Sequence, residues 1–247
     1  STVGPEGRLV PAWMEATGLP APAWAGEARG SLWQKIEQPF VARAADDVAP
    51  VPVVAAGVVV FGTTSDEVRC VERDTGRLRW SYDPEVGKVA GMNLRTGWGV
   101  RGVAFWQGKV YVGTLDGRLV ALNADTGKVL WDKLTIPEGS HMAITGAPRI
   151  VKGKVLIGSA GAEYITRGYL AAYDTETGKE AWRFYTVPGD PSKPFEGKHL
   201  EAAAKTWAPD AWKNGGGGTV WDSITYDPKT DLVYFGTANA EPWNPAA

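Results

Sequence analysis

The feature that most constrains the fold of this chain is an internal repeat of 51 residues. Trp80, Trp131 and Trp182 mark it, because each ends one copy and follows the glycine of an acid-Thr-Gly turn by four residues. A fainter copy ends at Trp33, and a last partial copy covers 232–237. Repetition at a fixed period of about 20–50 residues is typical of proteins that stack one supersecondary unit many times.

Each copy is predicted to form four short strands. In the clearest copy we expect strand A at 98–106, strand B after the turn at Gly108, strand C at 118–124 and strand D around Trp131. Apolar residues alternate along these segments, as they do in half-buried strands, and do not follow helical spacing. The turn glycines supply the positive φ that tight hairpins need. One helix is predicted at 199–207, on an insertion between strands.

Four strands in a unit of about 40–50 residues is the signature of a β-propeller blade. We therefore predict an all-β fold, a β-propeller of four-stranded antiparallel blades in which the repeated tryptophans dock each blade on the next. At 51 residues per blade the 247 residues hold about four to five blades. The last unit lacks strands C and D, so the ring is expected to be incomplete. The prediction is one partial propeller domain, 1–247, with 51–247 as regular blades and 1–50 as a poorly matched first segment.

Composition excludes several functions. The net charge of −2 offers no basic surface for nucleic acid or an anionic membrane. No apolar run reaches the roughly 20 residues that span a bilayer, and the chain does not begin like a signal peptide. Cys70 is the only cysteine, and His141 and His199 lack partners at zinc-site spacing. No nucleophile elbow, phosphate loop or dinucleotide fingerprint is present.

Function is expected where the repeat breaks. The third copy has six extra residues in its B–C loop, 160–168, and the fourth unit departs at the same loop, 238–244. Because adjacent strands are antiparallel, the B–C loops and the starts of the A strands lie at one end of the propeller. We expect that end to collect four candidate site residues, which are Glu163, Asn239, Arg101 and Trp221.

These four side chains together suit a flat anionic ligand and a cation. A carboxylate and an amide oxygen are ligands for a hard cation such as Ca²⁺. A guanidinium suits an anion, and an indole offers a face for stacking. Each residue also has an ordinary alternative. Glu163 could be a solvated acid, Asn239 a turn former, Arg101 a salt-bridge partner and Trp221 a core or docking residue.

Several stretches resemble a known family, the pyrroloquinoline quinone (PQQ)-dependent alcohol dehydrogenases. These are eight-bladed quinoproteins of the methanol and ethanol dehydrogenase type. The resemblance covers roughly 76–244 and would make this chain about the N-terminal half of such a protein. The stretches that carry it are GKVYVGTLDGRLVALNADTGKVLW at 108–131, GAPRIVKGKVLIG at 146–158, GAE at 161–163 with RGY at 167–169, and GGGGTVWDSITYDPKTDLVYFGTANAEPWN at 215–244.

The resemblance implies a function and a role for each candidate residue. It implies PQQ- and calcium- or lanthanide-dependent oxidation of a small alcohol to an aldehyde in the periplasm, with a cytochrome c-type electron acceptor. Glu163 and Asn239 would be metal ligands. The residues that would bind the quinone are Arg101, Gly161, Ala162, Glu163 and Trp221. No catalytic residue is assigned, since the family's aspartate falls well after the Asn239 position and the chain stops first.

The sequence also departs from the family pattern. Arg95-Thr96 stand where a cysteine pair is expected, and Ala49, Ala143 and Ala160 replace an acid, a hydroxyl residue and a serine. The alternative function is a non-enzymatic propeller scaffold or binding module with PQQ-like repeats. For the dehydrogenase-like interpretation, one hypothesis is that a second half-propeller chain, or self-association, closes the ring, because open blade edges favour pairing.

Overall fold

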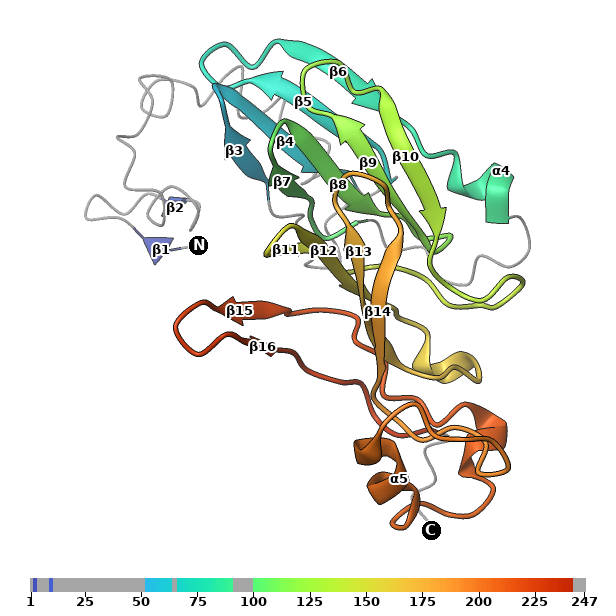
Figure 1. Ribbon diagram of the computed structural model, residues 1–247. Helices are drawn as coiled ribbons and strands as arrows, with labels where there is room; N and C mark the ends of the chain where they lie inside the picture. The colour runs from blue at the N-terminus through green and yellow to red at the C-terminus, as the bar shows by residue number, and fades with distance from the viewer. Residues whose placement is uncertain (1, 4–8, 11–51, 64–65, 91–99, 242–247) are drawn as a thin grey trace.

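The computed structural model describes residues 2–3, 9–10, 52–63, 66–90 and 100–241, and shows three four-stranded antiparallel sheets (Figure 1). The strands of the first sheet are β3 (Val53–Ala55), β4 (Val58–Gly62), β5 (Val68–Glu72) and β6 (Leu78–Tyr82). Those of the second are β7 (Ala104–Trp106), β8 (Lys109–Gly113), β9 (Arg118–Asn123) and β10 (Val129–Leu134). Those of the third are β11 (Arg149–Val151), β12 (Lys154–Gly158), β13 (Tyr169–Asp174) and β14 (Glu180–Tyr185).

A fourth unit has two described strands, β15 (Thr225–Asp227) and β16 (Leu232–Tyr234). A two-stranded ladder near the N-terminus joins β1 (Thr2–Val3) and β2 (Leu9–Val10). The helical segments are α4 (Val86–Ala90), η2 (Ala162–Tyr164), α5 (Lys198–Ala204) and η3 (Ala211–Asn214). No helix within the described ranges is long and apolar enough to cross a membrane. The predicted all-β partial propeller is thus confirmed.

The A strands are shorter than the sequence suggests. Strand A of the second blade was expected at 98–106, yet β7 begins at Ala104, and the first strand of the fourth unit, β15, begins only at Thr225. The reason is that backbone groups before these strands make hydrogen bonds outside the strand ladder of their own sheet. The Arg101 amide, for example, donates to the Thr145 carbonyl of the next blade. The expected helix is present but shifted, and ends at Ala204.

The repeated tryptophans join neighbouring blades, as predicted, at the two joints between complete sheets. The Trp80 indole Nε1 donates to the Ala124 carbonyl at 2.8 Å, and Trp131 makes the matching bond to Thr175 at 3.1 Å. Both rings are 8% exposed. At the first joint a Cβ on Gly127 would lie 2.7 Å from the Trp80 ring. Glycine is therefore needed there for clearance as well as for its φ of 70°.

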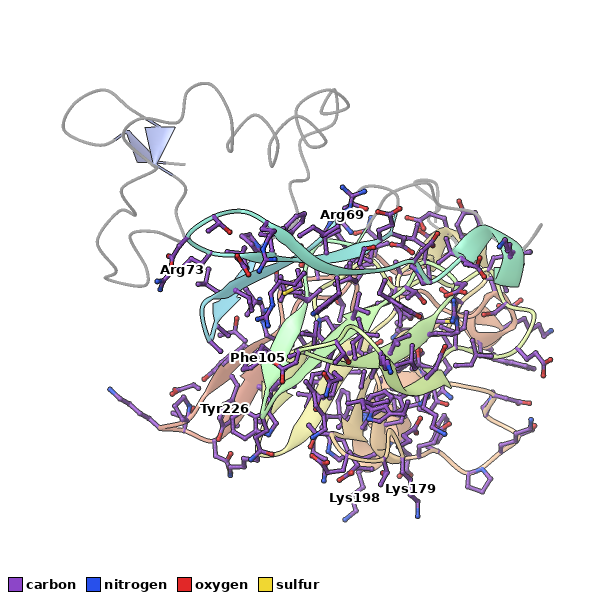
Figure 2. The ribbon with its side chains drawn as sticks, turned by 90° about the horizontal axis from the view of Figure 1, so that it is seen from above. Arg69, Arg73, Phe105, Lys179, Lys198 and Tyr226 are labelled. Carbon is purple, nitrogen blue, oxygen red and sulfur yellow. The ribbon has the colours of Figure 1, made fainter. Side chains whose placement is uncertain are left out.

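Apolar side chains fill the space between successive blades. One cluster lies between the first and second sheets, a second between the second and third, and a third where β15–β16 meets the third sheet. Figure 2 shows the side chains crowded between the ribbons, whereas Lys179 and Lys198 project outward. The core is thus a series of interfaces, each shared by two neighbouring blades.

Candidate functional site

The B–C loops and the A-strand starts lie together, as antiparallel order predicts. Ala143, before the third blade's strand A, and Ala160, in its B–C loop, exchange backbone hydrogen bonds of 3.3 and 2.7 Å. The Ile144 amide donates to the Thr114 carbonyl of the second blade's B–C loop at 3.3 Å. The end of the propeller that carries the candidate residues is therefore held by bonds between blades.

Arg101 and Trp221 come together at this end, although 120 positions separate them in the chain. The guanidinium carbon of Arg101 lies 5.1 Å from the centroid of the Trp221 ring, within cation–π range. Thr145 lies between the two backbones. Its carbonyl accepts the Arg101 amide and guanidinium at 3.2 and 3.3 Å, and its hydroxyl donates to the Trp221 carbonyl at 3.5 Å.

The Trp221 ring is unlike the docking tryptophans because 41% of its surface is exposed. Its backbone is nevertheless tightly held, since a Cβ on Gly146 would lie 2.6 Å from the Trp221 carbonyl oxygen. A fixed backbone with an open ring is an arrangement suited to receiving a planar ligand. The buried rings of Trp80 and Trp131, which dock between complete blades, do not have this arrangement.

The inserted loop of the third blade places Gly161, Ala162 and Glu163 in a single helical turn. Gly161 has φ 100° and precedes η2, and its carbonyl accepts the Thr166 hydroxyl at 2.8 Å. Ala162 is buried, whereas the Glu163 side chain is exposed. Ile165 follows with φ 58°, a left-handed conformation that is unusual for a β-branched residue. The loop is therefore a defined turn that presents Glu163 to solvent.

The glycine run 215–218 ties this loop to the segment that carries Asn239. All four glycines have positive φ. The Gly217 amide donates to the Thr166 carbonyl, and the Gly218 amide donates to the Asn239 carbonyl, both at 3.0 Å. A Cβ on Gly217 would lie 2.4 Å from that Asn239 oxygen. The run is thus a structured turn leading to Trp221, and not a flexible linker.

Metal binding by Glu163 and Asn239 stays a prediction. Both side chains are exposed, and the glycine run connects their loops through backbone hydrogen bonds. Across residues 52–63, 66–90 and 100–241, no three His, Cys, Asp or Glu side chains form a metal-binding group. The departures from the family pattern at Ala49 and at Arg95-Thr96 lie outside the described residues.

Sequence reasoning missed Asp66, a buried acid in the first blade's B–C loop. Its side chain is 1% exposed, and Oδ2 accepts the Leu115 amide at 3.0 Å. Burial raises the pKa of Asp66 to about 7; the charge of Asp116 raises it further, while the Leu115 hydrogen bond and Arg118 lower it. Asp66 and Asp116 lie in the B–C loops of neighbouring copies. This recurrence of an acid in the same loop is the sequence signal that could have identified Asp66.

Comparison with known proteins identifies the family. The sequence pattern of the PQQ family described as "Glucose/ethanol/alcohol dehydrogenase, beta-propeller domain" matches residues 21–243. The chain belongs to this family. It is 55% identical over 194 residues to quinohemoprotein alcohol dehydrogenase ADH IIB of Pseudomonas putida, and 48% identical over 200 residues to quinohemoprotein alcohol dehydrogenase of Comamonas testosteroni. These alignments cover 78% and 80% of this chain but 28% of each relative.

Solved structures agree with this assignment. The crystal structure of the Comamonas testosteroni quinohemoprotein alcohol dehydrogenase superposes with a TM-score of 0.75 at 48% identity, covering 79% of this chain and 30% of that one. A europium-containing methanol dehydrogenase gives 0.68 at 32% identity, covering 78% and 35%. The chain thus corresponds to under a third of the length of its quinohemoprotein relatives.

Proposed function

We propose that this chain is part of a PQQ-dependent alcohol dehydrogenase that oxidises an alcohol to an aldehyde. The observation that carries the proposal is the pairing of Arg101 with the exposed ring of Trp221 at the end of the propeller where the repeat breaks. Family membership supports it, because the family is built around this quinone. In this proposal the chain contributes part of the cofactor site.

The residues at this end fit the proposed cofactor. PQQ is flat and carries carboxylates, so it calls for a stacking surface and a cation. Trp221 offers an open indole face, and Arg101 stands over it with its charge. Thr219, at the turn before Trp221, has a buried hydroxyl with no hydrogen-bond partner among the described residues. The turn therefore has an uncommitted polar group as well as the open ring.

Each candidate residue has a proposed task. Trp221 would form the floor under the quinone ring, and Arg101 would neutralise and orient its anionic edge. Gly161 and Ala162 would offer backbone groups. Glu163 and Asn239 would supply oxygen ligands to Ca²⁺ or a lanthanide. When bound, the metal and quinone together supply a polarised acceptor for hydride from the alcohol.

The remaining features of the family are proposed on the strength of the relatives alone. The electron acceptor would be a cytochrome c-type protein, consistent with the word quinohemoprotein in the names of two relatives. The compartment would be the periplasm. The substrate would be a small alcohol. No residue of this chain is proposed as the catalytic base.

Titration with PQQ and Ca²⁺, followed by tryptophan fluorescence, tests the proposal. We expect saturable quenching that needs both components and weakens at least about tenfold in Trp221→Phe, because a smaller ring provides less stacking surface. Arg101→Gln should weaken binding of PQQ similarly, since it removes the cation. Glu163→Gln should raise the Ca²⁺ concentration required.

Trp106→Phe is the matched control. The Trp106 ring is exposed to a similar extent, 39%, but it ends β7 beside the A–B turn, at the opposite end of the blade. Its replacement should leave PQQ affinity unchanged. Quenching that is the same in Trp221→Phe, Arg101→Gln and the native chain would contradict the proposal and favour a scaffold that merely shares the repeat.

A further inference from the structure

Arg167 stands four residues after Glu163, where the inserted loop of the third blade returns to β13. Its guanidinium forms two bonds with the Glu196 carboxylate, from Nη1 to Oε1 at 2.6 Å and from Nη2 to Oε2 at 2.9 Å. Its Nε donates to the Val187 carbonyl at 3.1 Å, and Cζ lies 3.9 Å from the centroid of the Tyr185 ring. One side chain thus joins the loop to the end of β14 and to the segment that follows β14.

The Arg167–Glu196 pair differs from an isolated surface ion pair, which contributes little to stability. Its two parallel bonds add geometric specificity as well as energy. The Arg167 side chain is only 23% exposed. The backbone at Gly189 packs against the guanidinium, since a Cβ there would lie 2.8 Å from the Arg167 Cζ. The guanidinium is therefore held in one place by several groups at once.

The backbone of Arg167 belongs to a stack of three chain segments, 166–168, 216–218 and 239–241. Arg167 and Gly217 form a parallel bridge. In it the Gly217 amide donates to the Thr166 carbonyl at 3.0 Å, and the Gly168 amide donates to the Gly217 carbonyl at 2.7 Å. Gly217 also forms an antiparallel bridge with Ala240. The middle segment thus joins the inserted loop to the end of the fourth unit's B–C loop.

The two proposed metal ligands belong to the outer segments of this stack. Glu163 lies in the inserted loop, four residues before Arg167. Asn239 lies in the third segment, and its carbonyl accepts the Gly218 amide at 3.0 Å. Both ligand side chains are exposed, so their positions depend on the backbones that carry them. A shift of the stack would therefore change the separation of Glu163 and Asn239.

We propose that Arg167 is a positioning residue for the metal site. By holding the stack against Glu196 and Val187, it sets how far apart the loops of the two metal ligands lie. The inference rests on the proposed function, because Glu163 and Asn239 are metal ligands only in that proposal. Arg167 touches neither metal nor quinone in this role. Groups that orient ligands without touching the metal typically change metal affinity by about 10- to 100-fold.

Titration of the full chain with Ca²⁺ at saturating PQQ, followed by tryptophan fluorescence, tests this role. Arg167→Ala should raise the Ca²⁺ concentration at half-maximal quenching at least about tenfold. The amplitude of quenching at saturating Ca²⁺ should stay unchanged, because Trp221 and Arg101 are untouched. Glu196→Ala removes the same contact from its more exposed end, 45% exposed, and should act in the same direction. The double variant should need no more Ca²⁺ than Arg167→Ala, because the two residues act as a pair.

Arg183→Ala is the matched control. Arg183 bonds to the Glu180 carboxylate through Nε and Nη2 at 3.2 and 2.6 Å, and its Nη2 donates to the Thr135 carbonyl at 3.0 Å. Its Cζ lies 4.0 Å from the centroid of the Tyr169 ring, and its side chain is 19% exposed. These bonds join the second and third blades. Its removal should lower the midpoint of urea unfolding about as much as removal of Arg167, yet leave the Ca²⁺ requirement unchanged.

Amide hydrogen exchange, measured without metal or quinone, reports on the stack directly. The amides of Gly168, Gly217 and Gly218 should exchange at least about tenfold faster in Arg167→Ala than in the native chain or in Arg183→Ala. Normal quenching of the native chain with an unchanged Ca²⁺ requirement in Arg167→Ala, or with an equal rise in Arg183→Ala, would overturn the positioning role alone. Absence of Ca²⁺-dependent quenching in the native chain would overturn the proposed function, and this role of Arg167 with it.

Discussion

The joints between blades and the candidate site use tryptophan in opposite ways. At the joints, Trp80 and Trp131 are buried, bonded through Nε1 and seated on glycine turns. At the site, Trp221 has an exposed ring with Arg101 above it, while its backbone is fixed by Thr145 and close packing. The difference shows that the tryptophans docked between complete blades serve the fold, whereas Trp221, outside the repeat, keeps an open ring face.

Removing a docking tryptophan should have the largest effect on stability. Trp131→Ala is expected to lower the free energy of unfolding by about 3–5 kcal/mol, because it leaves a cavity and removes one of the two hydrogen bonds that the Thr175 carbonyl accepts. Urea unfolding followed by circular dichroism measures this. Trp182→Ala is the control within the repeat, and should cost under about 1 kcal/mol since its ring is already exposed. Equal losses would show that burial of the ring does not decide how much a repeated tryptophan contributes to stability.

A methyl group at a receiving turn should have the next largest effect. Gly127→Ala adds a Cβ 2.7 Å from the Trp80 ring at a position with φ 70°, so a loss of about 2–3 kcal/mol is expected. Gly139→Ala shares the positive φ, 72°, but its Cβ would meet nothing within 4 Å. Its cost should be about 1 kcal/mol, from backbone strain alone. Thermal unfolding of both variants separates the steric cost of the contact with Trp80 from the cost of backbone strain.

Asp66 should make the first joint sensitive to pH. Burial raises the pKa of Asp66 from the ordinary aspartate value of 3.8 to about 7 in the folded chain. The folded chain therefore holds this proton more tightly, and the stability from the group is present in full below about pH 4 and lost as pH rises through 7. Asp66→Asn should stabilise the chain by about 2 kcal/mol at pH 8 and by almost nothing at pH 4. The same gain at both pH values would rule out this proton linkage.

The smallest stability effect should come from the site itself. Trp221→Phe is expected to change the free energy of unfolding by no more than about 0.5 kcal/mol, because the ring is exposed and makes no docking contact. The same variant is expected to lose PQQ affinity. Equilibrium unfolding of the variant used in the quenching titration measures both properties. A loss as large as that of Trp131→Ala would place Trp221 among the architectural residues.

The regular part of the fold could be predicted from the sequence because the same pattern of strands and turns occurs in three copies of the repeat. The strands of 109–134, their turns and the docking of Trp80 and Trp131 all follow from the period. The meeting of Arg101 with Trp221 followed from antiparallel strand order. These inferences depend on local patterns that recur.

Features fixed by contacts between non-repeated segments could not be predicted. The second blade's strand A is cut short where the Arg101 amide donates to Thr145 of the next blade, which no local pattern reveals. The burial of Asp66 depends on Leu115 in the neighbouring loop. Ile165 adopts a left-handed conformation that its residue type disfavours, and the bonds around it, such as that from Gly217 to Thr166, come from a distant turn.

The blade-to-blade bond over 44 residues has a consequence for cooperativity. Each docking tryptophan reaches only the next blade, so the free energy of the array is a sum of blade terms and nearest-neighbour terms. Such an array opens from an end where a neighbour term is missing. Strands β8 and β9 belong to a blade with an apolar cluster on each face, so their amide protons are expected to exchange with solvent among the last of the described residues.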